Sequence, residues 1–157
     1  DVFLALRGMR TLALRMQQHW QTGLHLAQML QQHPLVERVM HPALTQDPGH
    51  ALWKRDFLGA SGLFSIALRP MDRQALAGFF DALQLFGIGL SWGGYESLVL
   101  PMDVPRRNTK SWPLQGPLVR IHAGLEDAED LAADLCQALA AAQDLMRPAN
   151  PSLAQAC

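Results

Sequence analysis

The first 32 residues carry a hydrophobic pattern with helical spacing. Its apolar or small members recur at steps of three and four residues, and they are Leu12, Met16, Trp20, Gly23, Ala27 and Leu30. This spacing places them on one face of a helix, with Gly8 as a weak point and Pro34 as the stop. A helix of about 30 Å is long for a domain of this size. We expect either a linker between two folded bodies or an ordinary amphipathic helix of one domain.

Shorter apolar stretches predict the strands. They cover residues 35–40, 63–68, 86–90, 98–100 and 117–122, and Pro101 is expected to end the fourth. Helical spacing returns over residues 50–56, from a cap at Asp72 to about residue 85, and from a cap at Asp127 to about residue 145. Asp130 follows Asp127 by three residues and is the expected capping-box partner.

This order of elements predicts the fold class. Helices and strands are mixed without strict alternation, which favours an α+β fold. We expect a mostly antiparallel sheet of about four strands with helices packed on one face, preceded by the long N-terminal helix. We divide the chain into a long helix over residues 1–34, a domain over residues 35–145 and a tail over residues 146–157.

Composition and charge narrow the class of protein. The 157 residues suit one domain, and 17% charged residues is low where about 25% is usual. Either part of the surface is normally covered, or the composition is simply rich in Ala and Leu. A net charge of −1 predicts no nucleic-acid partner, and the short basic cluster over 106–110 is interpreted as a solvated loop. We also expect no membrane span, because no apolar run approaches ~18 residues.

Arg120 is the most informative single residue. It lies within the apolar stretch 118–121, where a guanidinium is costly unless an anion meets it. The planar fork of arginine suits a carboxylate in a bidentate pair. Two partners are open at this point: an acid of the same domain, such as Glu126 or Asp127, or the carboxylate of a ligand.

The segment Ser91-Trp92-Gly93-Gly94 is the second candidate. Two glycines after a strand let a ligand approach the backbone closely, with N–H groups free to bind it. Trp92 then forms the wall of a pocket. The alternative is a glycine turn beside a core tryptophan.

The remaining reactive side chains show no catalytic or metal-binding pattern. The six histidines lack ligand spacing, so we expect surface or capping roles for them and no metal. Cys136 is interpreted as an inert core thiol, and its distance from Cys157 argues against a disulfide. This cysteine usage fits a reducing, cytoplasmic setting.

Two motifs resemble the C-terminal part of the Cys/Met-metabolism enzymes that use pyridoxal phosphate (PLP), which share fold type I. The first is Ser-Trp-Gly-Gly-Tyr-Glu-Ser-Leu at residues 91–98, and the second runs from Leu-Val-Arg-Ile-His-Ala-Gly to Asp-Leu over residues 118–131. Residues 6–16 and 53–65 are also similar, so the resemblance covers about residues 1–145. Within the family, Trp92 and Tyr95 favour the cystathionine β-lyases, because the γ-synthases and γ-lyases usually carry a smaller aliphatic pair there.

The resemblance implies roles for three residues and for the first helix. Arg120 matches the arginine that binds the α-carboxylate of the substrate. Ser91 is implied as a catalytic and substrate-binding residue, because the family's serine helps position the carboxylate and the reactive lysine. Trp92 is implied to assist the carboxylate through its backbone N–H. The long helix over residues 1–34 matches the family's inter-domain helix.

The resemblance also shows what this chain lacks. The family's lysine, which bonds covalently to PLP, cannot be mapped here, because neither Lys54 nor Lys110 has the family's surrounding motif. We therefore expect a parent enzyme whose N-terminal domain holds the PLP, and a chain that is inactive alone. The implied reaction is β-elimination of L-cystathionine in methionine biosynthesis and transsulfuration, by a homotetramer. The alternatives are a related cystine or cysteine-conjugate β-lyase, or a catalytically inactive truncated interaction domain.

Overall fold

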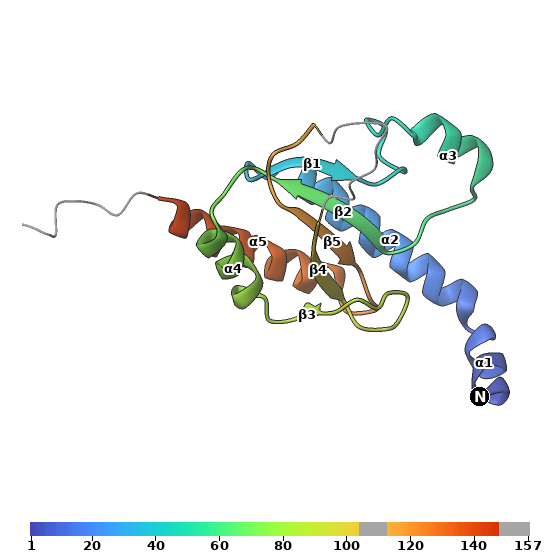
Figure 1. Cartoon of the computed structure of the whole chain (residues 1–157). Coiled ribbons are helices and arrows are strands. Elements are labelled where there is room, and N and C mark those ends of the chain that lie inside the picture. The colour runs from blue at the N-terminus through green and yellow to red at the C-terminus, as the bar shows by residue number, and fades with distance from the viewer. Residues whose placement is uncertain (104–112, 148–157) are drawn as a thin grey trace, which may run out of the picture.

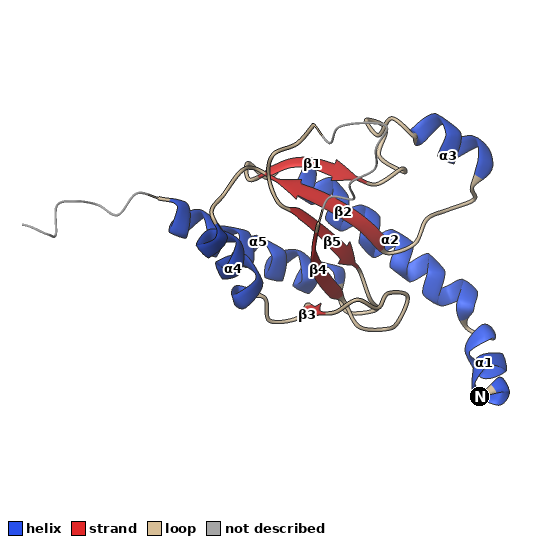
Figure 2. Ribbon diagram, in the orientation of Figure 1, coloured by secondary structure: helices blue, strands red, loops and turns tan. Residues whose placement is uncertain are grey.

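The computed structural model describes residues 1–103 and 113–147, which form a mixed sheet with helices packed against it (Figures 1 and 2). In chain order the elements are α1 (Val2–Met9), α2 (Leu12–Gln31), β1 (Val36–Met40), α3 (His50–Asp56), β2 (Leu63–Leu68), α4 (Arg73–Ala82), β3 (Gly87–Ile88), β4 (Leu98–Met102), β5 (Leu118–His122) and α5 (Ala128–Met146). The basic cluster over 106–110 and most of the predicted tail lie outside the described residues. The predicted α+β class is confirmed.

The sheet has the strand order β1-β2-β5-β4-β3. All neighbours are antiparallel except β3 and β4, which run parallel and make the sheet mixed. The prediction that Pro101 ends a strand was wrong, because β4 continues to Met102 with Pro101 opposite Val119. The short β3 pairs only with Leu98 and Val99, so β4 is already an edge strand at Pro101, where a missing N–H is tolerated.

Alternation along the strands separates a covered face from an open one. Phe64, Ile66, Val119 and Ile121 are all at most 4% exposed and belong to one hydrophobic core. The helices contribute buried residues to the same core, namely Leu26, Ala27 and Leu30 of α2 and Leu131, Leu135, Ala138, Leu139 and Ala142 of α5. The helices α2 and α5 therefore cover the same face of the sheet, as predicted.

Two glycines stand at the ends of the β2–β5 ladder. A side chain at Gly62, just before β2, would overlap the backbone of Ala123, just after β5. A side chain at Gly116, just before β5, would overlap the backbone of Leu68, at the end of β2. Close backbone approach at both ends thus requires glycine and fixes how the two strands pair.

The predicted N-terminal helix is divided at Arg10 and Thr11. At the break, the carbonyl of Gly8 accepts hydrogen bonds from the Thr11 N–H at 3.3 Å and from Arg15 Nη2 at 2.8 Å. These contacts replace the regular helical bond and end α1. No residue of α1 is buried, and Leu12 and Met16 at the start of α2 are also exposed. The predicted apolar face therefore meets the core only from the third turn of α2 onward.

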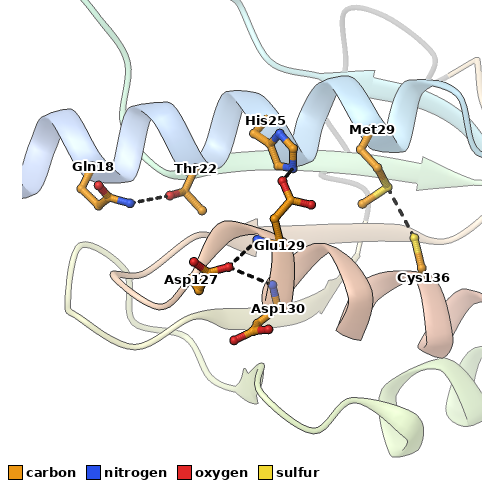
Figure 3. A network of polar contacts seen from close by, with 8 residues as sticks. All are labelled: Gln18, Thr22, His25, Met29, Asp127, Glu129, Asp130 and Cys136. Atoms are coloured by element: carbon orange, nitrogen blue, oxygen red, sulfur yellow. Dashed lines mark hydrogen bonds and ion pairs between the residues drawn. The ribbon is translucent and has the colours of Figure 1, made fainter.

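The helices α2 and α5 pack side by side through a small set of polar contacts (Figure 3). His25 Nε2 lies 3.3 Å from Glu129 Oε1, and Cys136 Sγ lies 3.7 Å from Met29 Sδ. Cys136 is exposed, so the prediction of a core thiol was wrong: it lies one position off the buried stripe of α5. Asp127 caps α5 by accepting the N–H groups of Glu129 and Asp130.

The carboxylate of Asp134 on α5 holds the connection between α4 and β3. It accepts hydrogen bonds from the N–H groups of Gln84, Leu85 and Phe86 at 2.8–3.2 Å. These bonds draw the chain away from the helical path, so α4 ends at Ala82 rather than near residue 85. Burial alone would raise the pKa of Asp134, but these N–H donors outweigh it and lower the pKa.

Candidate functional site

Arg120 lies at the centre of β5, with a paired strand on each side. Its backbone is opposite Ser65 of β2 and Leu100 of β4. Because Val119 and Ile121 point into the core, Arg120 projects from the opposite, open face of the sheet, and it is half-buried. The strand pairing thus places the guanidinium on a rigid part of the molecule.

The Arg120 guanidinium binds backbone carbonyls of the β3–β4 connection. Nη2 donates to the carbonyl oxygens of Gly89, Leu90 and Ser91 at 3.2, 2.6 and 3.3 Å. Within residues 1–103 and 113–147 it forms no ion pair, and Nε and Nη1 donate no hydrogen bond. The salt-bridge alternative is therefore wrong for the described acids. As far as the described residues go, two donor atoms of the guanidinium, Nε and Nη1, are left for an anion.

The two acids proposed as partners are engaged elsewhere. Glu126 accepts hydrogen bonds from the N–H and Oγ of Ser97 at 2.8 and 2.7 Å. Asp127 caps α5. Sequence spacing could not show this, because Ser97 lies 29 residues before Glu126.

The segment 91–96 lies on the surface beside Arg120. Trp92 is 61% exposed and Tyr95 is 74% exposed, so the alternative of a core tryptophan was wrong. Gly93 has φ +82°, a conformation that L side chains rarely adopt. The turn therefore presents its backbone to solvent next to the guanidinium, as the glycine pattern predicted.

A row of contacts joins this turn to the end of β5. The Gly124 N–H donates to Ser97 Oγ at 2.8 Å, and the Leu125 N–H donates to the Tyr95 carbonyl at 2.8 Å. A side chain at Gly124 would overlap the backbone of Tyr95 and Glu96. Together with the contacts of Arg120, these bonds hold the turn at both ends. The two motifs noticed in the sequence thus form one site.

Two histidines lie behind the site, and sequence reasoning missed both. His122 is 2% exposed and His19 is 1% exposed, so the expectation of surface or capping roles was wrong for them. His122 Nε2 receives the Gly93 N–H at 3.0 Å and lies 3.2 Å from the Gly94 carbonyl. The ring of His19, from α2, lies with its centroid 5.2 Å from that of His122. The alternation of β5 already placed His122 on the face of Arg120, which was the available signal.

The pKa of His122 is lowered, chiefly because burial disfavours the charged ring. Repulsion from the Arg120 guanidinium, and from the neighbouring His19 ring whenever that ring is charged, acts in the same direction. The Gly94 carbonyl and the Glu126 carboxylate act against them. At neutral pH we therefore treat His122 as uncharged.

The arrangement suits one end of a small anionic ligand. Free guanidinium N–H groups beside an exposed glycine turn can bind a carboxylate in a defined orientation. The described residues contain no group of three or more His, Cys, Asp or Glu that could hold a metal. Lys54 is exposed on α3, and Lys110 lies outside the described residues. The described part of the chain therefore offers no buried lysine that fits the covalent attachment of PLP.

A separate apolar groove of about 1140 Å³ lies between α2 and the segment around α3. Trp20, Leu52, Trp53, Phe57 and Leu58 contribute to its lining, which includes no Lys, Arg, Asp or Glu. This groove lacks the positive charge that a carboxylate needs. None of the described helices has the length and apolarity that crossing a membrane requires.

Comparison with known proteins agrees with the geometry. The family described as "Cys/Met metabolism PLP-dependent enzyme" matches residues 1–140. The cystathionine β-lyase of Bordetella avium is 49% identical over 142 residues, which cover 88% of this chain and 35% of that enzyme. An L-alanine/L-glutamate racemase of Wolbachia pipientis is 46% identical over 143 residues, covering 89% of this chain and 36% of that enzyme.

A solved structure shows the same fold. The cystathionine γ-synthase of Xanthomonas oryzae pv. oryzae, in complex with cystathionine, superimposes with a TM-score of 0.81 and 34% sequence identity. The match covers 92% of this chain and 38% of that one. The chain thus spans about a third of the length of the proteins it matches.

Proposed function

Since the chain belongs to the Cys/Met metabolism PLP-dependent enzyme family, we propose that it is the C-terminal domain of a carbon–sulfur lyase resembling cystathionine β-lyase. The parent enzyme would convert L-cystathionine to homocysteine, pyruvate and ammonia by β-elimination. PLP would be held by an N-terminal domain that this chain does not contain. We also expect a homo-oligomer in the cytoplasm.

The observation that carries the proposal is that Nε and Nη1 of Arg120, beside Ser91 and Trp92, have no partner among residues 1–103 and 113–147. Nη2 of Arg120 is anchored on the Ser91 carbonyl, which orients Nε and Nη1 without using them. We assign Arg120 to the α-carboxylate of the amino-acid substrate. Ser91 and the backbone N–H of Trp92 complete the carboxylate site, and Ser91 is also the catalytic member because it helps position the reactive lysine of the parent enzyme.

A second candidate function comes from the racemase relative, which is nearly as similar as the lyase. Racemisation and β-elimination of an amino acid both begin with removal of the proton on the α-carbon. Both reactions need the α-carboxylate held in place so that the Cα–H bond has the right orientation. We assign the binding of that carboxylate to this chain. The two reactions differ in the sulfur-containing side chain of the substrate: β-elimination breaks its C–S bond, and racemisation does not.

The direct test is a fusion protein in which this chain replaces the matching segment of the Bordetella avium cystathionine β-lyase. We expect the fusion to form pyruvate from L-cystathionine, whereas this chain mixed alone with PLP and L-cystathionine should form none. A fusion that folds and binds PLP, yet interconverts L- and D-alanine without forming pyruvate, would favour the racemase. If it does neither, the proposal fails.

A further inference from the structure

The hydrogen-bond partners of His122 and His19 determine where each ring carries its proton. A backbone N–H can only donate, so His122 Nε2, which receives the Gly93 N–H at 3.0 Å, is the unprotonated nitrogen. The proton of the neutral ring then lies on Nδ1. A carbonyl can only accept, so His19 Nδ1, at 2.8 and 3.1 Å from the carbonyl oxygens of Ala123 and Gly124, carries the proton of that ring.

This assignment leaves one donor and one acceptor buried between neighbouring rings. His122 Nδ1 and His19 Nε2 are both buried, and neither has a hydrogen-bond partner. The first needs an acceptor and the second needs a donor. The ring centroids are 5.2 Å apart, so the two rings pack against each other, but no hydrogen bond joins them.

We propose that His122 is a positioning residue of the carboxylate site: as a neutral ring it holds the Ser91–Gly94 turn by accepting the Gly93 N–H at Nε2, and the ring of His19 packs against it from α2. The inference rests on the proposed function in one respect, which is that the turn binds a substrate carboxylate. It adds a link from that turn, through β5, to the long helix α2. Neither histidine touches the reacting atoms.

Protonation of His122 would reverse its contact with the turn. With a proton on Nε2, the ring no longer accepts the Gly93 N–H and instead donates to the Gly94 carbonyl, 3.2 Å away. The charged or titratable groups around the ring are His19 of α2, Arg120 of β5 and Glu126 of the loop before α5. We therefore expect substrate affinity to fall as the pH drops and His122 becomes charged.

The first test uses this chain labelled with ¹⁵N and measures the imidazole nitrogens by NMR at pH 7. We expect His122 to be neutral with its proton on Nδ1, and Nδ1 of His19 to carry a proton, as its two carbonyl contacts require. A His122 ring that is charged at pH 7, or protonated only on Nε2, would overturn the proposal. This outcome does not depend on which reaction the parent enzyme catalyses.

The second test measures kinetics in the fusion protein. His122→Leu removes the acceptor, and we expect KM for L-cystathionine to rise about tenfold with kcat changed less than twofold. His122→Gln can accept the Gly93 N–H but does not titrate, so it should restore KM to within about twofold and remove its rise at low pH. His25→Leu, which changes a histidine of α2 that contacts Glu129 of α5 rather than the turn, is the matched control and should leave KM unchanged. Equal KM values for wild type and His122→Leu would contradict the positioning role.

Discussion

At the scale of single residues, Arg120 owes its orientation to neutral partners. Three carbonyl oxygens hold Nη2 in place, and no carboxylate of the described residues neutralises the charge. A cation held only by dipoles keeps its attraction for an anion, whereas a salt bridge would have consumed it. The fork is therefore pre-oriented for a ligand before any ligand arrives.

Replacement of Arg120 should affect substrate affinity first. Loss of a charge-assisted hydrogen bond is worth about 2 kcal/mol, so in the fusion protein we expect Arg120→Ala to lower kcat/KM about 30-fold, mainly through KM. Arg120→Lys keeps the charge but loses the planar fork and should recover only part of the loss. Arg73→Ala, at the exposed start of α4, is the control. A near-normal KM in a folded Arg120→Ala protein would remove Arg120 from the carboxylate site.

The importance of Arg120 was evident from the sequence, because an arginine inside an apolar stretch needs an anion. Its actual contacts were not, since Gly89, Leu90 and Ser91 act through carbonyls that every residue possesses. For the same reason nothing in the sequence indicated that His122 receives the Gly93 N–H. Side-chain chemistry can be read from residue types, but backbone partners follow only from the fold.

At the scale of elements, the connection between α4 and β3 depends on a single carboxylate. Asp134 is 5% exposed and accepts three backbone N–H groups that have no helical partner. Its pKa is lowered in the folded chain. The ionised form therefore stabilises the fold above the ordinary carboxyl pKa of about 3.9, and this contribution is lost as the pH falls through the lower folded pKa.

Neutralising this residue should cost stability in a pH-dependent way. We expect Asp134→Asn to lower the free energy of unfolding by about 2 kcal/mol at pH 7, measured by urea denaturation. The difference from wild type should shrink below about pH 4, where the Asp134 carboxyl of the unfolded chain protonates while the folded form, with its lowered pKa, is still ionised. Asp81→Asn, which changes an exposed acid on α4, should have little effect at either pH. A difference that is the same at pH 7 and pH 3 would contradict the electrostatic explanation.

Most elements could be predicted from the sequence, and the exceptions have local causes. Strands and helices with regular apolar spacing, such as β2 and α5, were placed within a few residues. The ends were less certain, because Arg15 closes α1 from seven residues away and Asp134 ends α4 from about 50 residues away. A pattern of local spacing contains neither contact.

At the scale of the whole molecule, the N-terminal region stands apart from the core. Val2, Phe3, Leu4, Leu6 and Met9 of α1 are 56–76% exposed, and none is buried. These exposed apolar side chains form an apolar surface at this end of the molecule, and they account in part for the low content of charged residues in the sequence. The stability of the described domain should therefore depend little on α1.

Deletion of residues 1–9 tests this independence. Because α1 buries nothing, we expect the free energy of unfolding in urea to change by less than about 0.5 kcal/mol. Leu30→Ala, which removes a fully buried side chain of α2, should instead cost about 2–5 kcal/mol. A loss above about 1 kcal/mol for the deletion would show that α1 supports the core.

The glycines at the two ends of the β2–β5 ladder have a consequence for how the site tolerates change in chain length. Successive residues of β5 point to opposite faces of the sheet. Arg120 and His122 therefore reach the site only while β5 keeps the pairing with β2 that Gly62 and Gly116 fix. One residue inserted between Gly116 and Arg120 would turn the guanidinium into the core, although every functional side chain would still be present. In this strand, an insertion or deletion is therefore more harmful than most substitutions.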